Sequence, residues 1–171
     1  MKGKTMKTGS GLLSALLLLT VLAFAAPATA QTCNGLPATI VGTVNGDTIY
    51  GTAGDDVIVG LGGNDKLLGA VGNDEICGGG QTDVLYGNEG NDHLMGYGGD
   101  DYLYGGSGND LLAGHDYPDQ LFGHEGNDEI YGGTGSDFLD GGEGTDILNG
   151  REGADSCQYG ETYLSCETIF G

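Results

Sequence analysis

The chain has 171 residues, of which 37 are glycine and 25 are aspartate or glutamate, and its formal net charge is −20. This negative charge disfavours nucleic acids and anionic membrane surfaces as direct partners, because both repel carboxylates. Many polyacidic chains are disordered. If this chain folds, the reason must lie in how its glycines and acidic residues are spaced.

Residues 1–30 have the pattern of an export signal. Lys2, Lys4 and Lys7 precede an apolar run over residues 12–26, and residues 28–30 (Ala-Thr-Ala) form a small-residue cleavage site. The apolar run is shorter than the roughly 18 residues that a membrane-spanning helix needs. We therefore predict a signal peptide over residues 1–30, no membrane insertion, and secretion to the extracellular space or a periplasm. Its removal would change the formal net charge from −20 to −23.

A nine-residue unit repeats thirteen times without insertion over residues 42–158. Each unit starts with glycine and has aspartate at its sixth position. The eighth position is Ile or Leu in every unit except the last, which has Cys157. The fourth position is glycine in ten units, and the exceptions are Asn45, Gln81 and Tyr117. Such a period indicates a solenoid. We number the units 1 to 13 from Gly42 and the positions one to nine within each unit.

Each unit divides into a turn and a short strand. Positions one to six are rich in Gly, Asn and Asp, which favour tight turns, and positions seven to nine carry β-forming residues. In a three-residue strand the eighth side chain points to one face, and it is the uniformly aliphatic one. We predict an all-β parallel β-roll over residues 42–158, with two units per coil and two facing parallel sheets. Residues 31–41 form an N-terminal segment, and residues 159–171 form a C-terminal cap.

The four cysteines all follow the predicted signal peptide. An even number of cysteines in an oxidising compartment indicates two disulfides. Of the three connectivities we favour Cys33–Cys77 and Cys157–Cys166. The first folds the N-terminal segment over an early coil, and the second ties residues 159–171 to the last unit.

The periodic aspartates indicate a cation-binding protein, because one aliphatic side chain per unit buries too little surface to order so many glycines. Position-six carboxylates and backbone carbonyls form an all-oxygen site, which suits Ca²⁺ better than Mg²⁺ or Zn²⁺. Sites between unit n and unit n+2 number at most eleven, and eleven Ca²⁺ ions would nearly balance the charge. The candidate ligands are Asp47, Asp56, Asp65, Asp74, Asp83, Asp92, Asp101, Asp110, Asp119, Asp128, Asp137, Asp146 and Asp155.

The units resemble the RTX, or haemolysin-type, calcium-binding repeat, whose pattern is G-G-x-G-x-D-x-U-x. Residues 105–113 (GGSGNDLLA) match it at every specified position. The resemblance implies a calcium-stabilised β-roll in which each position-six aspartate binds Ca²⁺. Many family members also carry an enzyme or pore-forming domain and a C-terminal export signal. This chain has an N-terminal signal instead and no stretch for such a domain, so we expect no enzymatic activity. His93, His115 and His124 have no nucleophile placed beside them.

Two functional interpretations follow. The first is a secreted calcium-binding protein that folds on binding the ion and has a structural or envelope role. The second is a calcium-dependent adhesin or matrix protein whose aromatic ladder binds polysaccharide or a cell-surface partner; the alternative explanations are that aromatic residues simply suit strands, or that the tail covers them. The ladder comprises Tyr50, Leu68, Tyr86, Tyr104 and Phe122 at position nine, with Val84, Tyr102 and Phe138 at position seven.

The two edges of the predicted roll differ at position four. All three exceptions to glycine fall in odd-numbered units, so they share one edge. The even-numbered units have an unbroken row of glycine. We expect the best-formed sites on that edge, at Asp56, Asp74, Asp92, Asp110, Asp128 and Asp146.

Overall fold

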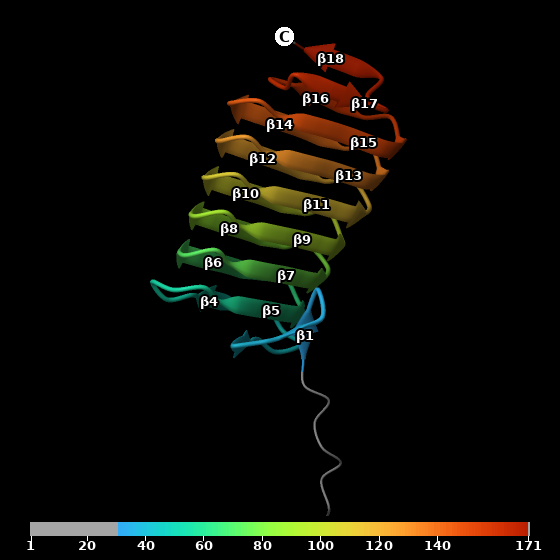
Figure 1. Cartoon of the computed structure of the whole chain (residues 1–171). Coiled ribbons are helices and arrows are strands. Elements are labelled where there is room, and N and C mark those ends of the chain that lie inside the picture. Colours follow the sequence, from blue (N-terminus) through green and yellow to red (C-terminus); the bar gives the residue numbers. More distant parts are fainter. Residues whose placement is uncertain (1–30, 171) are drawn as a thin grey trace, which may run out of the picture.

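The computed structural model describes residues 31–170, so the predicted signal peptide lies outside the described residues. The chain winds into a stack of flattened coils, each made of two strands joined by turns (Figure 1). Two eight-stranded parallel sheets face each other, and the prediction of an all-β parallel roll is confirmed. Within residues 31–170 no helix is long and apolar enough to cross a membrane.

The strands alternate between the two sheets along the chain. The first sheet contains β4 (Thr48–Tyr50), β6 (Lys66–Val71), β8 (Val84–Glu89), β10 (Tyr102–Ser107), β12 (Gln120–Glu125), β14 (Phe138–Glu143), β16 (Ser156–Gln158) and β18 (Thr168–Phe170). The second contains β3 (Ile40–Val41), β5 (Val57–Gly62), β7 (Glu75–Gly80), β9 (His93–Gly98), β11 (Leu111–Asp116), β13 (Glu129–Gly135), β15 (Ile147–Gly153) and β17 (Thr162–Leu164). A short antiparallel hairpin joins β1 (Thr32–Cys33) to β2 (Leu36–Pro37).

Most strands are longer than the sequence predicts. β10 spans six residues and runs from position seven of one unit to position three of the next, not only over positions seven to nine. Its pairing with β12 continues past Gly105, where Gly106 and Ser107 lie opposite His124 and Glu125. The reason is that neighbouring strands are separated by 18 residues and share the same backbone shape, so the ladder continues across a bend that both strands make.

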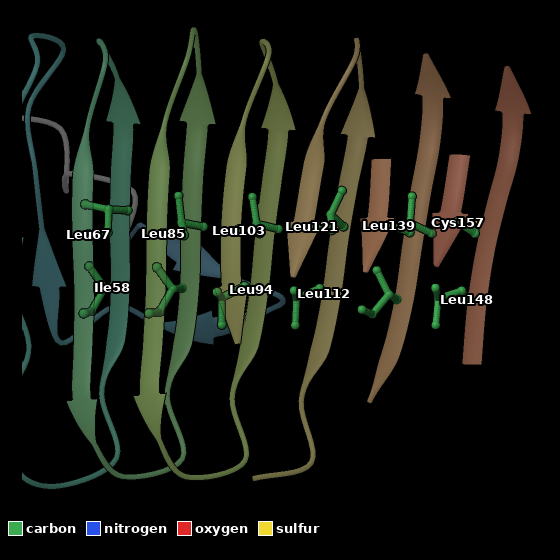
Figure 2. Packing of buried hydrophobic residues seen from close by; sticks show 12 residues of the cluster. Ile58, Leu67, Leu85, Leu94, Leu103, Leu112, Leu121, Leu139, Leu148 and Cys157 are labelled. Atoms are coloured by element: carbon green, nitrogen blue, oxygen red, sulfur yellow. The ribbon is translucent and has the colours of Figure 1, made fainter. Parts of the chain in front are cut away.

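The position-eight side chains form the core between the two sheets, as the alternation predicts. Figure 2 shows them as two facing columns along the roll. The twelve from units 2 to 13 are fully buried, with no exposed surface, and Ile49 of unit 1 packs against them while partly buried. The twelve are Ile58, Leu67, Ile76, Leu85, Leu94, Leu103, Leu112, Leu121, Ile130, Leu139, Leu148 and Cys157. The core is therefore continuous along the roll but only one residue per unit wide.

Both predicted disulfides are present. Cys33 is bonded to Cys77, which holds the β1–β2 hairpin against an outer face of the roll. Cys157 is bonded to Cys166 in the C-terminal tail. The tail does not cover the aromatic side chains of the first sheet. It extends both sheets by one strand each, because β17 pairs with β15 and β18 pairs with β16.

Replacing a core leucine should destabilise the whole roll. We expect Leu103→Ala to lower the free energy of unfolding in Ca²⁺ by about 2–5 kcal/mol, because it opens a cavity in a core with few other contacts. Leu111→Ala is the matched control, since Leu111 is next to the core position but faces outward and is only half-buried. Urea unfolding followed by circular dichroism measures both. Equal losses in the two variants would contradict a core made of the position-eight side chains alone.

Candidate metal-binding turns

The position-six aspartates form a ladder that links successive coils. In units 3 to 13 the Oδ1 atom of each aspartate accepts a hydrogen bond from the backbone N–H of the aspartate 18 residues earlier, at 2.7–2.9 Å. Asp110 is typical, because its Oδ1 accepts from Asp92 and its own N–H donates to Asp128 Oδ1. Each carboxylate therefore fixes the turn of the preceding coil through one hydrogen bond.

The second oxygen of these same carboxylates has no protein partner. Oδ2 is buried and accepts no hydrogen bond in Asp65, Asp74, Asp83, Asp92, Asp101, Asp110, Asp119, Asp128, Asp137, Asp146 and Asp155. None of these eleven residues is more than 3% exposed. Burying an ionised oxygen without a partner is strongly unfavourable. Eleven such oxygens in one regular series indicate a ligand that the protein itself does not supply.

The glycine at position one leaves room beside each of these oxygens. A Cβ atom added at Gly69 would collide with Asp74 Oδ2, and one added at Gly105 would collide with Asp110 Oδ2. A side chain at position one would therefore displace the carboxylate, and this explains why the residue is glycine in every unit.

The backbone of units 3 to 13 is left-handed at positions two and four. Positive φ angles occur at both positions in all eleven units, including non-glycine residues such as Leu61 (83°), Tyr97 (74°) and Tyr117 (80°). For an L-residue this conformation costs about 1–2 kcal/mol, and such strain is typical of functional sites. Of the three position-four exceptions to glycine, Gln81 and Tyr117 are left-handed like the glycines at that position, whereas Asn45 is not.

The donor set fits calcium. Within residues 31–170 no group of three or more His, Cys, Asp or Glu side chains could hold a metal ion. A cation in these turns must therefore take most of its ligands from backbone carbonyls, with one or two carboxylate oxygens. An all-oxygen set of this kind on an irregular loop suits Ca²⁺, whereas Zn²⁺ sites use Cys and His.

The comparison with protein families agrees with this chemistry. A family model described as the RTX calcium-binding nonapeptide repeat matches four times, over residues 41–76, 78–112, 104–139 and 122–157. The chain belongs to this family. RTX repeats bind Ca²⁺. No curated protein matches the chain.

Burial changes the acidity of the carboxylates in these RTX turns. Desolvation raises the pKa of Asp83, Asp101 and Asp110 to about 7 and that of Asp119 to about 8, although each accepts a backbone hydrogen bond that acts the other way. Neighbouring carboxylates in the ladder raise these pKa values further. The protein surroundings alone therefore disfavour the charged form at neutral pH, and a bound cation would reverse this.

Units 1 and 2 differ from the other RTX turns. Asp47 and Asp56 are position-six residues, but their Oδ2 atoms accept hydrogen bonds from Thr43 and Thr52. Burial raises the pKa of Asp56, but the hydrogen bonds from Thr52 and Thr39 outweigh this and hold that pKa below its ordinary value. The repeat pattern makes both aspartates candidate ligands and places Asp56 among the best-formed sites, but it gives no role to these threonines.

The C-terminal tail continues the ladder with glutamate. The Oε2 atom of Glu161 accepts from Asp146 N–H at 2.6 Å, and that of Glu167 accepts from Asp155 N–H at 2.5 Å. Without these glutamates, the backbone N–H groups of Asp146 and Asp155 would have no carboxylate from a following coil as acceptor. Sequence reasoning missed both residues, because the tail does not keep the nine-residue period.

A second ladder runs along the edge formed by the even-numbered units. Asn73 Oδ1 accepts from Asn91 N–H at 3.0 Å, and Asn91 Oδ1 accepts from Asn109 N–H at 2.7 Å. Asn127 continues the series and accepts from Thr145 N–H at 2.8 Å. The signal in the sequence is asparagine at position five of units 4, 6, 8 and 10. This ladder is a further difference between the two edges, beside the residues at position four.

The three histidines lie on strands β9, β11 and β12 and contact side chains other than the position-six aspartates. His93 Nδ1 is 2.9 Å from Glu75 Oε1 on the neighbouring strand. His115 stacks on Tyr97, with 4.9 Å between ring centroids. His124 lies beside the rings of Tyr104 and Phe122. Their neighbours give them roles in packing the outer faces of the sheets.

The raised pKa values predict a pH dependence for the metal-free chain. Between the unfolded pKa of about 4 and the folded values of about 6 to 8, the folded roll binds more protons than the unfolded chain. Its stability is therefore greatest at the acidic end and falls as pH rises through 6 to 8. We expect metal-free protein to show more β-structure by circular dichroism at pH 5 than at pH 8.

The calcium-loaded protein is the control for this measurement. Protons compete with Ca²⁺ for the carboxylates, so its calcium affinity should be lower at pH 5 than at pH 8. More β-structure at pH 8 than at pH 5 in the metal-free sample would contradict the burial of unpartnered carboxylates.

Proposed function

We propose that this RTX chain is a secreted calcium-binding protein that folds on binding Ca²⁺ between its stacked turns and has a structural or envelope role. The observation that carries the proposal is the series of eleven buried Oδ2 atoms without a protein partner. The predicted signal peptide and the two disulfides support export, because disulfides persist in oxidising compartments.

The ladder explains how calcium binding would become folding. Bound calcium supplies the positive charge that the buried carboxylates need. Asp110 uses Oδ1 to hold the Asp92 turn and offers Oδ2 to the ion, so ordering one turn also places half of the next. Stability in such a stack is a sum of units and nearest-neighbour interfaces. We therefore assign position six in units 3 to 13 as the calcium-binding carboxylates, with up to eleven ions.

We also propose that the chain is not an enzyme. Every position-six aspartate from Asp65 onward has one oxygen in the ladder and the other buried in its turn. Such carboxylates stabilise the stacked turns and are not exposed to a substrate. Acid–base catalysis requires a carboxylate within hydrogen-bonding distance of a substrate.

A calcium titration tests the main proposal. We expect β-structure to appear in a steep transition at about 10⁻⁴–10⁻³ M Ca²⁺, the range of extracellular modules, and to be lost in excess EDTA. Asp110→Asn should raise the calcium midpoint and lower the Hill coefficient, because it removes the ion-facing oxygen but keeps an acceptor for Asp92 N–H. Asp47→Asn is the matched control and should change little, since Thr43 closes that turn.

Either of two results would contradict this mechanism. A β spectrum that is unchanged by EDTA would show that the fold does not need the ion. A Hill coefficient near one in the unmutated protein, or equal effects of the two variants, would show that the turns fill independently.

A second candidate function is a calcium-dependent adhesin or matrix protein. The specific observation is a row of aromatic rings on the outer face of the first sheet. Tyr86 stacks on Tyr104 with 4.8 Å between ring centroids and 9° between planes, and Tyr104 stacks on Phe122 with 5.1 Å and 7°. All three side chains are partly exposed. The row is held in place by parallel pairing of β8, β10 and β12.

An open groove of about 780 Å³ continues this aromatic row toward the C-terminal end. Phe122 and His124 line it together with the carboxylates of Glu125, Asp140 and Glu143. Aromatic faces beside hydrogen-bond acceptors are the chemistry that binds sugar rings. This arrangement supports polysaccharide as the partner, ahead of a cell-surface protein.

Removing the tyrosines separates this candidate from the first. We expect Tyr86→Ala combined with Tyr104→Ala to lower the signal on a glycan array at least tenfold relative to the control variant. The calcium midpoint should stay unchanged. Tyr131→Ala is the control, because Tyr131 lies on the second sheet beside Arg151. An array on which the calcium-loaded protein retains no glycan would count against the polysaccharide.

A further inference from the structure

We propose that Thr43 and Thr52 take the place of calcium in the first two turns, so that the roll begins with a metal-independent coil. This inference rests on the proposed function, because it divides the thirteen units into eleven that bind the ion and two that do not. It assigns to the two threonines a role that the repeat pattern does not contain.

The contacts carry the proposal. Asp47 Oδ2 accepts a hydrogen bond from Thr43 N–H at 2.7 Å and another from the Thr43 hydroxyl at 2.8 Å. Asp56 Oδ2 repeats the arrangement with Thr52, at 2.6 and 2.9 Å. The same oxygen has no partner in every later unit. In these two turns, the backbone amide and the hydroxyl of one threonine donate hydrogen bonds to Oδ2. In the later turns, a cation would bind that oxygen instead.

The backbone shows the same division. Positions two and four are left-handed in units 3 to 13, but Thr43, Thr52, Asn45 and Gly54 lie outside the left-handed region. The difference orients the position-two N–H toward the carboxylate. Eleven turns with left-handed residues at positions two and four and eleven unpartnered oxygens therefore occur in the same units. Threonine occupies position two in units 1 and 2 alone.

Asp56 has a further closing contact from the N-terminal segment. Its Oδ1 accepts a hydrogen bond from the Thr39 hydroxyl at 3.2 Å, so both carboxylate oxygens have protein partners. The Cys33–Cys77 disulfide ties this segment to unit 4. The first coil is thus closed by hydrogen bonds and by a covalent link, without a contribution from metal. It can serve as the end from which calcium-driven ordering proceeds along the stack.

Two measurements on the full-length mature protein test the inference. In excess EDTA, we expect amide hydrogen exchange to show residual protection within residues 42–56 and none within residues 60–158. In Ca²⁺, native mass spectrometry should count as many bound ions in Asp47→Asn as in the unmutated protein, because Asp47 Oδ2 is occupied by Thr43, whereas Asp110→Asn should bind at least one ion fewer.

Variants separate the hydroxyl contact from general destabilisation. Thr43→Val combined with Thr52→Val should reduce the protection of residues 42–56 in EDTA by about tenfold or more, since each lost hydroxyl bond to a carboxylate corresponds to at least that factor. The double serine variant should restore it. Thr145→Val is the control, because Thr145 is exposed and its contact with Asn127 uses the backbone N–H.

The outcomes are distinct from those of the calcium titration. Loss of a bound ion in Asp47→Asn, or the absence of protection in residues 42–56 in EDTA, would overturn the inference even if the protein folds with Ca²⁺. Protection lost equally in the serine and valine variants would overturn the role of the hydroxyl. Protection confined to residues 42–56, with an unchanged ion count in Asp47→Asn, would establish it.

Discussion

The structure depends on a buried carboxylate whose two oxygens have different partners. In each middle turn, Oδ1 accepts a backbone N–H from the preceding coil, whereas Oδ2 faces into its own turn. The first contact is directional and sets the stacking of coils at 18 residues. The second leaves a negative charge in a place that water does not reach. An ionised carboxylate in this arrangement needs a balancing positive charge, and protonation removes that need, because an unpaired buried charge is strongly unfavourable.

The rest of the chain is consistent with that dependence. The core is one aliphatic side chain per unit, and the turns hold non-glycine residues such as Tyr97 and Tyr117 in left-handed conformations. A narrow core and a strained backbone would be a poor basis for an independent fold. They are tolerable where ion binding contributes to folding, which is the general behaviour of small metal-dependent domains.

The ends of the roll show how such a stack is terminated. At the N-terminal end Thr43 and Thr52 satisfy the carboxylates that open the ladder, and at the C-terminal end Glu161 and Glu167 satisfy the amides that close it. Repeat proteins generally need atypical terminal units, because an internal unit leaves one face without a neighbour. Here the disulfides reinforce both ends, so that the most irregular parts of the chain are also covalently attached to the roll.

The sequence by itself determined the coil, the inward-facing position and the alignment of the periodic aspartates as a series, because an uninterrupted nine-residue period brings equivalent residues into register automatically. It also favoured both disulfide pairs, although Cys33 and Cys166 lie outside the repeat. The tertiary structure decided the six-residue strands, the asparagine ladder, the kept backbone shape at Gln81 and Tyr117, and the contacts of Thr43, Thr52, Glu161 and Glu167. These features depend on φ angles and on atoms one coil apart. Threonine at position two is an ordinary turn residue until the turn brings its amide and hydroxyl within hydrogen-bonding distance of a carboxylate.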